Sequence, residues 1–372
     1  MSRQQIALGR VFGIPIGLDY SWFLIFALIT WALAASYYPA EFPDWAPALY
    51  WVMGALTAVM LFVSVLLHEL GHSLVALRFR IPVRSITLFI FGGVSQIASD
   101  PPSAFAEFLV ALAGPVVSFS LAALFEVLKN LVGGGGPVFG LLEYLAFING
   151  ALALFNLIPG FPLDGGRIFR AIVWAITRNM QRATWIAAMV GRGFAFLFIL
   201  YGVWQVFSGR IADGIWIAFI GWFLDNAAAA QVQQQAVQGR LTGHTVAQVM
   251  EPHVPTIAGS MLLQQLVDEH VMRTGERAFL VTDGPGAAGL LTFHRLTEVP
   301  REDWATTSAA QAMVPFDRVR SVAPDTDVWK ALQEMEQAGA SQLPVVADGK
   351  VVGLLSRQDV TAFLRTLREL GT

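Results

Sequence analysis

The chain has 372 residues, of which 55% are hydrophobic and only 14% are charged. A soluble protein carries about 25% charged residues, so we expect at least part of this chain to lie in a membrane. The formal net charge of −3 gives no reason to expect a nucleic-acid partner. Because the chain has no cysteine, thiol catalysis, disulfides and cysteine zinc sites are excluded.

The first twenty residues are short apolar pieces interrupted by glycine and proline, and an apolar run follows over residues 21–37. This run is either the core of a signal peptide or a first transmembrane helix. It is longer than a typical signal core, and Trp22, Trp31 and Tyr37 resemble interfacial anchors. We therefore predict a transmembrane helix.

Five further apolar segments are each near the length needed to cross the hydrocarbon core. They cover about 49–78, 103–131, 138–158, 185–207 and 211–231. Ser99 or Asp100 is expected to cap the third segment, with Pro101 at its first helical position. The sequence thus predicts an α-helical polytopic membrane domain with six transmembrane helices.

Positive charge is distributed unequally between the two sides of this six-span domain. Lys129 and Arg210 fall on one side. The other side holds Arg3, Arg10, Arg78, Arg80, Arg84, Arg167, Arg170, Arg178, Arg182 and Arg192. The positive-inside rule therefore predicts that both termini lie in the cytoplasm, with His72 and residues 160–170 toward the cytoplasmic half.

The segment between the second and third spans, residues 85–97, is too short to span as a helix. It is rich in β-branched and aromatic residues and has Gly92 and Gly93 in its middle, which predicts a strand or a re-entrant β-hairpin. Strand backbone exposed to lipid is not tolerated, so the segment must lie against protein or line a cavity. The alternative is an interfacial loop.

The second span carries the motif His68-Glu69-Leu70-Gly71-His72. Histidines at i and i+4 lie on one helix face and can reach a single tetrahedral zinc. Glu69 is then beside the metal, where it can take a proton from water. The alternative is a pair of histidines satisfied on a buried helix, but ionisable groups within a membrane span are costly and usually functional.

A catalytic zinc needs a third protein ligand, and the membrane domain has no third histidine. The carboxylates within or near the spans are Asp100, Glu107, Glu126, Glu143, Asp164, Asp213 and Asp225. We favour Asp164, because it lies in an apolar segment broken by Pro159 and Pro162 and followed by Gly165-Gly166, which permit an unusual turn. Most of the other carboxylates are expected at solvated span ends.

Charged residues become frequent from Arg240 onward, and this soluble part contains an internal repeat. Residues 249–252 match 312–315, and residues 289–292 match 353–356. Each unit reads turn, helix, strand, strand, helix, with first strands at 279–282 and 343–346. We therefore predict a membrane domain over 1–238 and two packed α/β units over 239–305 and 306–372.

These motifs together resemble the site-2 proteases, which are intramembrane zinc metalloproteases, and in particular the prokaryotic subgroup with a C-terminal pair of CBS domains. The first family motif is His68-Glu69-x-x-His72, and the second is Asn156-x-x-Pro159-x-x-Pro162-x-Asp164-Gly165. The start over 10–15 and the stretch 91–93 also look like this family. The resemblance covers nearly the whole chain.

The resemblance implies one Zn²⁺ per chain held by His68, His72 and Asp164, with Glu69 as general base. It also implies that Asn156 contributes to substrate or oxyanion binding, although a helix-end cap is the alternative for this residue. The expected substrate is a membrane-anchored protein with a single span, cut in or beside its transmembrane segment. We hypothesise that an edge strand at Gly92-Gly93 holds the unwound segment by strand addition.

The resemblance also implies that the CBS pair can bind an adenine nucleotide. The family's ribose-binding pattern is Gly-x-x-Ser/Thr-x-x-Asp, placed at a strand-to-helix turn. The second unit has this pattern complete with Gly353, Ser356 and Asp359. The first has Thr292 but carries Arg295 in place of the aspartate, and arginine cannot accept a hydrogen bond from a ribose hydroxyl. We expect at most one strong nucleotide site, although Asp359 could instead only cap its helix and the pair could only dimerise.

Two other functions remain as alternatives: a CBS-gated transporter, or an inactive relative that binds membrane partners. A transport site has no need of a general base between two zinc ligands, and an inactive relative would have lost Glu69 or a ligand. The expected location is the cytoplasmic membrane of a prokaryote, with the CBS domains in the cytoplasm.

Overall fold

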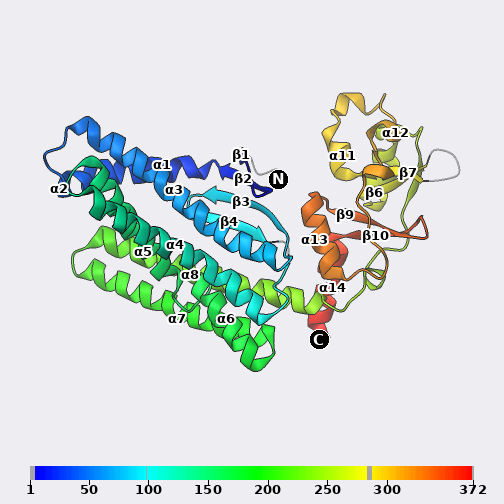
Figure 1. The fold of residues 1–372 in the computed structure, drawn as a ribbon. Helices are drawn as coiled ribbons and strands as arrows, with labels where there is room; N and C mark the ends of the chain where they lie inside the picture. Colours follow the sequence, from blue (N-terminus) through cyan, green and yellow to red (C-terminus); the bar gives the residue numbers. More distant parts are fainter. Residues whose placement is uncertain (1–4, 98, 283–286, 371–372) are drawn as a thin grey trace. The chain divides into compact units, whose positions relative to one another are not determined.

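We describe the chain from a computed structural model (Figure 1), which covers residues 5–97, 99–282 and 287–370. The chain forms two compact units, residues 1–235 and 236–372, and each is described by itself. Helix α8 (Ile211–Leu241) continues from the first unit into the second. The predicted domain limits at 238 and 305 remain predictions.

Within the described residues, six helical segments are long and apolar enough to cross a membrane, as predicted. They are Ser21–Glu41, which joins α1 (Ser21–Ala32), a π-helical turn (Leu33–Tyr37) and α2 (Tyr38–Glu41), and then α3 (Pro47–Arg78), α4 (Ala104–Val132), α5 (Pro137–Asn156), α7 (Met180–Phe207) and α8. A shorter amphipathic helix, α6 (Asp164–Thr177), lies between α5 and α7 and was not predicted. Helix α4 lies beside α3, α5 and α6, so it forms the centre of the bundle (Figure 1).

Helix α4 begins within one residue of the predicted start, but another residue caps it. Its N-cap is Ser103, whose side chain accepts a hydrogen bond from the backbone N–H of Ala106 at 3.2 Å. The prediction that Ser99 or Asp100 caps this helix was therefore wrong. The reason is Pro102, because a residue that precedes proline is pushed away from the helical region, so Pro101 cannot open the helix.

A four-stranded sheet lies in the membrane unit, with strand order β1-β2-β3-β4. Its strands are β1 (Gln5–Val11), β2 (Ile14–Asp19), β3 (Val83–Phe89) and β4 (Gly92–Ile97). The predicted hairpin is present as β3 and β4, but β2 pairs in parallel with β3 and so adds an N-terminal hairpin that the sequence analysis missed. The missed turn is Phe12-Gly13, with φ of 50° and 81°, which is typical of a two-residue hairpin loop.

One face of this sheet packs against α3 close to the histidine motif. Ile14 and Ile86 are buried against Leu70, which lies between the two histidines on the helix. Strand β4 is the edge of the sheet, and it also lies against α3 (Figure 1). The sheet therefore places an edge strand beside the motif.

The second unit contains two small sheets. Strands β5 (Thr256–Ala258), β6 (Ala278–Thr282), β7 (Ala287–Thr292) and β8 (Val314–Pro315) form one sheet, and β9 (Gln342–Ala347) pairs with β10 (Lys350–Ser356) in the other. The helices are α9 (Leu263–Leu266), α10 (Met272–Thr274), α11 (Phe293–Glu298), α12 (Ala309–Ala312), α13 (Val328–Ala338) and α14 (Arg357–Glu369). The predicted order of helix, strand, strand and helix in each repeat is confirmed.

The repeated sequence motifs have a structural reason. A Cβ at Gly289 would lie 2.7 Å from the sulfur of Met313, and a Cβ at Gly353 would lie 2.7 Å from the sulfur of Met250. Each motif segment thus crosses to the sheet of the other repeat, where only glycine leaves it room. The backbone shows the same crossing. Strand β8 of the second repeat pairs with β7 of the first, and Glu251 of the first repeat bridges to Leu354 of the second.

Candidate functional site

His68, His72 and Asp164 converge on one point inside the helix bundle. The Nε2 atoms of the two histidines are 3.1 Å apart, and Oδ2 of Asp164 lies 3.0 Å from the first and 3.1 Å from the second. The histidines are 4% and 3% exposed. Within the described part of the chain, these three form the group of possible ligands whose donor atoms converge. Tetrahedral zinc with bonds of about 2.0–2.1 Å needs donor atoms roughly 3.3 Å apart, so the spacing fits a metal.

Both imidazoles are held from α4 through their other ring nitrogen. Nδ1 of His72 is 2.7 Å from the carbonyl oxygen of Val110, and Nδ1 of His68 is 2.8 Å from the hydroxyl of Ser118. A carbonyl oxygen only accepts, so Nδ1 of His72 carries a proton, and this leaves Nε2 as the atom that a neutral ring would offer to a metal. Nε2 faces Oδ2 of Asp164, and a cation bound between these two atoms would be oriented by the contact of the ring with Val110.

Gly114 completes the cradle, and the sequence analysis missed it. A Cβ built at this position would collide with Nε2 of both His68 and His72, so only glycine leaves the meeting point of the donor atoms open. Val110, Gly114 and Ser118 are spaced four residues apart along α4, which puts them on one helix face. This spacing is the one signal in the sequence that could have identified them.

Asp164 is the first residue of α6. The non-helical segment 157–163 connects α5 to α6. The expectation that Gly165-Gly166 form an unusual turn was wrong, because both are helical and neither has a positive φ. Glycine is required at both positions because neighbouring backbone leaves no space for a side chain. A Cβ at Gly165 would collide with the carbonyl of Leu157, and one at Gly166 with the backbone of Gly160.

A buried ion pair ties α6 to α4. Nε of Arg170 donates to the carboxylate of Glu107 at 2.6 Å, and the two residues are 5% and 0% exposed. The guanidinium also lies over the ring of Phe161, 5.1 Å from its centre. The carboxylate of Glu107 is therefore paired with Arg170 on α6, and it is not part of the His68, His72 and Asp164 cluster. Two other carboxylates considered for the site, Glu126 and Asp225, also have basic partners.

Glu69 is half-buried beside the cluster, and strand β4 holds it. The hydroxyl of Ser95 donates to Oε2 of Glu69 at 2.5 Å. A Cβ at Gly93 would lie 2.6 Å from Cγ of Glu69, whereas Gly92 lies at the turn with a φ of 123°. Asn156 ends α5 without a side-chain hydrogen bond to the described part of the chain, and its role stays a prediction.

Comparison with known proteins agrees with this site. The model for peptidase family M50 matches residues 56–134 and 134–200, and the CBS domain model matches residues 311–366. The protein sll0528 of Synechocystis sp., named a zinc metalloprotease, is 35% identical over 97% of this chain and 96% of its own length. The chain belongs to peptidase family M50, the site-2 proteases. It is therefore a multi-pass zinc metalloprotease with a C-terminal CBS pair.

Two more members of this family are similar over most of their length. Rip3 of Mycobacterium tuberculosis, also named a zinc metalloprotease, is 34% identical over 98% of this chain and 94% of its own. The solved site-2 protease of Methanocaldococcus jannaschii is 30% identical, with a TM-score of 0.44, and covers 61% of this chain and 95% of that chain. The first match extends through the CBS pair as well as the protease unit.

The two strand-to-helix turns of the CBS pair differ as the sequence predicted. At the second turn, Oδ2 of Asp359 accepts from the backbone N–H of Ser356 at 2.8 Å and from its hydroxyl at 2.6 Å. The Ser356 hydroxyl accepts in return from the N–H of Asp359, which makes a capping box. At the first turn, Arg295 forms an ion pair with Glu298 instead.

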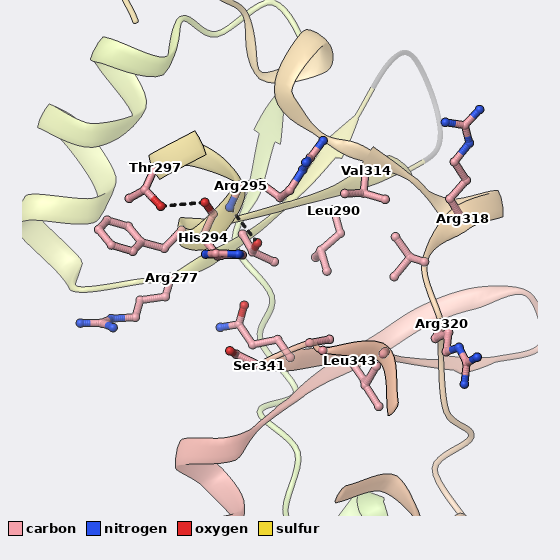
Figure 2. Close-up of a pocket in the computed structure, with 17 residues that line it drawn as sticks. Arg277, Leu290, His294, Arg295, Thr297, Val314, Arg318, Arg320, Ser341 and Leu343 are labelled. Atoms are coloured by element: carbon pink, nitrogen blue, oxygen red, sulfur yellow. Dashed lines mark hydrogen bonds between the residues drawn. The ribbon is translucent and has the colours of Figure 1, made fainter. Parts of the chain in front are cut away.

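A cavity of 610 Å³ opens at the first turn, between the two CBS repeats. Figure 2 shows Leu290 and Val314 beside the cavity, with Arg318 and Arg320 at its rim. Its basic lining residues are Arg277, His294, Arg295, Arg318 and Arg320, and none of its described lining residues is acidic. The cavity therefore combines an apolar interior with a basic rim, which suits an anion that carries an apolar part.

Proposed function

We propose that this protein hydrolyses peptide bonds of membrane-anchored proteins, in or beside a transmembrane segment. The observation that carries the proposal is the convergence of His68, His72 and Asp164 within a unit of six apolar helices. A metal at this point would lie among buried side chains within the membrane-spanning helices, so a substrate segment would reach it from the membrane.

His68, His72 and Asp164 would hold Zn²⁺. When bound, zinc lowers the pKa of a water molecule that it carries and polarises the scissile carbonyl. Glu69 takes a proton from the attacking water and delivers it to the nitrogen of the leaving amine. The carbon–nitrogen bond breaks, and a carboxylate and an amine leave.

We propose that the substrate is a single-span protein whose helix unwinds at the site. Its extended segment would add to β4, the edge strand that carries Gly92 and Gly93. Asn156 would donate a hydrogen bond to a substrate carbonyl from the end of α5. The arginine distribution supports a cytoplasmic location for both termini and for the CBS pair.

The test uses full-length protein in detergent, with zinc measured per chain and a transmembrane reporter as substrate. Glu69→Gln removes only the base, so it should keep zinc and lose about a hundredfold or more of turnover. Asp164→Ala should lower zinc occupancy. Glu126→Ala and Asp225→Ala are the matched controls and should retain zinc. Near-normal turnover by Glu69→Gln, or full zinc in Asp164→Ala, would contradict the proposal.

The basic cavity favours a second function, which is regulation of the protease through an adenine nucleotide bound by the CBS pair. Oδ1 of Asp359 makes no hydrogen bond to the described part of the chain, so it remains available to a ribose hydroxyl at the Ser356 turn. In the cavity beside the first turn, Arg318 and Arg320 can attract phosphates, although none of the described lining residues carries a carboxylate. We therefore infer one strong site at Ser356–Asp359 and a weaker, phosphate-driven site in the cavity.

Calorimetry of the full chain with ATP, ADP and AMP tests this second function. Asp359→Ala should remove the strong site, and Arg318→Gln should weaken only the remaining binding, which should also fall with salt. Two equal sites, or a strong site untouched by Asp359→Ala, would overturn the assignment. Reporter cleavage with and without the nucleotide then measures regulation.

A further inference from the structure

The hydroxyl of Ser95 is bound to the carboxylate of Glu69, although the two residues lie on different elements. Ser95 lies on strand β4, and its hydroxyl donates to Oε2 of Glu69 at 2.5 Å. Hydrogen bonds to charged acceptors are stronger than those between neutral groups. The contact therefore fixes one oxygen of the carboxylate and leaves the other without a hydrogen bond to the described residues.

Ser73 fixes the direction of this bond. Its hydroxyl, which is fully buried on α3, donates to the Ser95 hydroxyl at 3.2 Å. The Ser95 hydroxyl thus accepts from Ser73, and its own proton is directed to Glu69. Its backbone alternative, the carbonyl of Glu69, is more distant at 3.3 Å.

Strand β4 lies directly against the Glu69 side chain. Residues 93 and 95 point to the same face of the strand, because side chains alternate along it. Gly93 approaches Cγ of Glu69 too closely for any side chain, and Ser95 reaches the carboxylate. The same strand is the edge of the sheet. One strand therefore contacts the base with one face and presents free backbone groups along its edge.

We propose that Ser95 is a positioning residue that orients Glu69 for proton transfer and couples it to strand β4. The proposal rests on the proposed function, since it needs Glu69 as the base and β4 as the strand that receives the substrate. Ser95 would then hold the carboxylate in a fixed place beside a segment added to the edge of β4.

A double-mutant cycle tests the proposal on reporter cleavage. Ser95→Ala should lower kcat about tenfold to a hundredfold, since one charge-assisted hydrogen bond is lost, and should leave KM within about twofold. In a Glu69→Gln background, Ser95→Ala should lower the residual rate no further. Ser95→Thr, which keeps the hydroxyl, should recover most of kcat. An unchanged kcat in Ser95→Ala, with Glu69→Gln still inactive, would overturn this inference and leave the proposed function standing.

A second readout does not depend on turnover. The affinity of zinc-free protein for an uncleaved transmembrane peptide, measured by fluorescence, should be the same in wild type and Ser95→Ala, because the backbone edge of β4 is intact. A loss of affinity, or equal losses of rate in both backgrounds of the cycle, would show that Ser95 only supports the hairpin. Ser120→Ala is the matched control, since its exposed hydroxyl donates to the carbonyl oxygen of Val116 in its own helix. If Ser95→Ala fails to fold, Ser73→Ala should lower kcat in the same cycle.

Discussion

The metal cluster and the Ser356 turn of the CBS pair both match sequence motifs, but they are built in different ways. Each group of the cluster is held from a distant part of the chain. The rings of His68 and His72 are bound to residues 50 and 38 positions away. At the turn, Asp359 is bound by Ser356, three residues earlier. One site depends on how helices pack, and the other on a single turn of backbone.

This difference determines what a substitution costs. In the cluster, α4 supports both histidines and contacts α6, so a change on α4 affects several ligands together. At the turn, a change removes a local bond and leaves the rest of the unit intact. We therefore expect the largest effects on α4 and the smallest at Asp359, and the following experiments are ordered in that way.

Gly114→Ala should have the largest effect. Its Cβ would occupy the meeting point of the donor atoms and collide with both imidazoles, so zinc should be lost together with all measurable cleavage. Gly150→Ala on α5 is the matched control, because its Cβ would meet only Ala122, at 3.9 Å. Zinc per chain is the measurement. Full zinc in Gly114→Ala would show that the metal lies elsewhere.

Glu107→Ala should destabilise the membrane unit. It leaves the buried guanidinium of Arg170 without its partner, which typically costs about 3–5 kcal/mol in the free energy of unfolding. Because Arg170 ties α6 to α4, zinc affinity should fall as well. Unfolding in mixed detergent measures the stability, and Glu126→Ala is the control, since Glu126 pairs with Lys129 at an exposed position. Equal stability of the two variants would contradict the role of the pair.

Ser118→Ala should have a smaller effect, confined to one ligand. It removes the partner of Nδ1 of His68, and loss of such a partner commonly weakens metal affinity about tenfold to a hundredfold. Competition with a chelator measures this affinity. Ser120→Ala, which removes an exposed hydroxyl that donates to Val116 in the same helix, should bind zinc as the wild type does. A wild-type affinity in Ser118→Ala would mean that packing alone orients the ring.

The same contrast explains what the sequence could predict. His68, Glu69 and His72 lie on one turn of helix, so their spacing alone predicts a metal site. Asp164 followed from the broken apolar segment around it. The six spans followed from apolar length. In each case the signal lies within one continuous segment of the chain.

The remaining parts of the site depend on contacts between distant segments. Nothing near Gly114 or Ser118 tells which helix will lie across the histidines. Ser95 and the N-terminal strands become relevant only once β2 pairs with β3 and β4 lies on α3. The predicted turn at Gly165 was wrong for a related reason. A glycine is required there because the backbone of Leu157 lies too close for a side chain, and not because the chain turns.

The smallest effect is expected for Asp359→Ala in protein without nucleotide. The substitution removes one half of the capping box, whose loss typically costs about 1 kcal/mol. Amides in the first turn of α14 should then exchange with deuterium roughly fivefold faster, while those of the membrane unit should not change. Arg295→Ala is the matched variant at the first turn. Arg295 makes no reciprocal bond to Thr292 and pairs with Glu298 at an exposed position, so exchange in α11 should hardly change. Equal effects at the two turns would show that the capping box does not distinguish them, and a response in α4 to Asp359→Ala would show that the turn is not local.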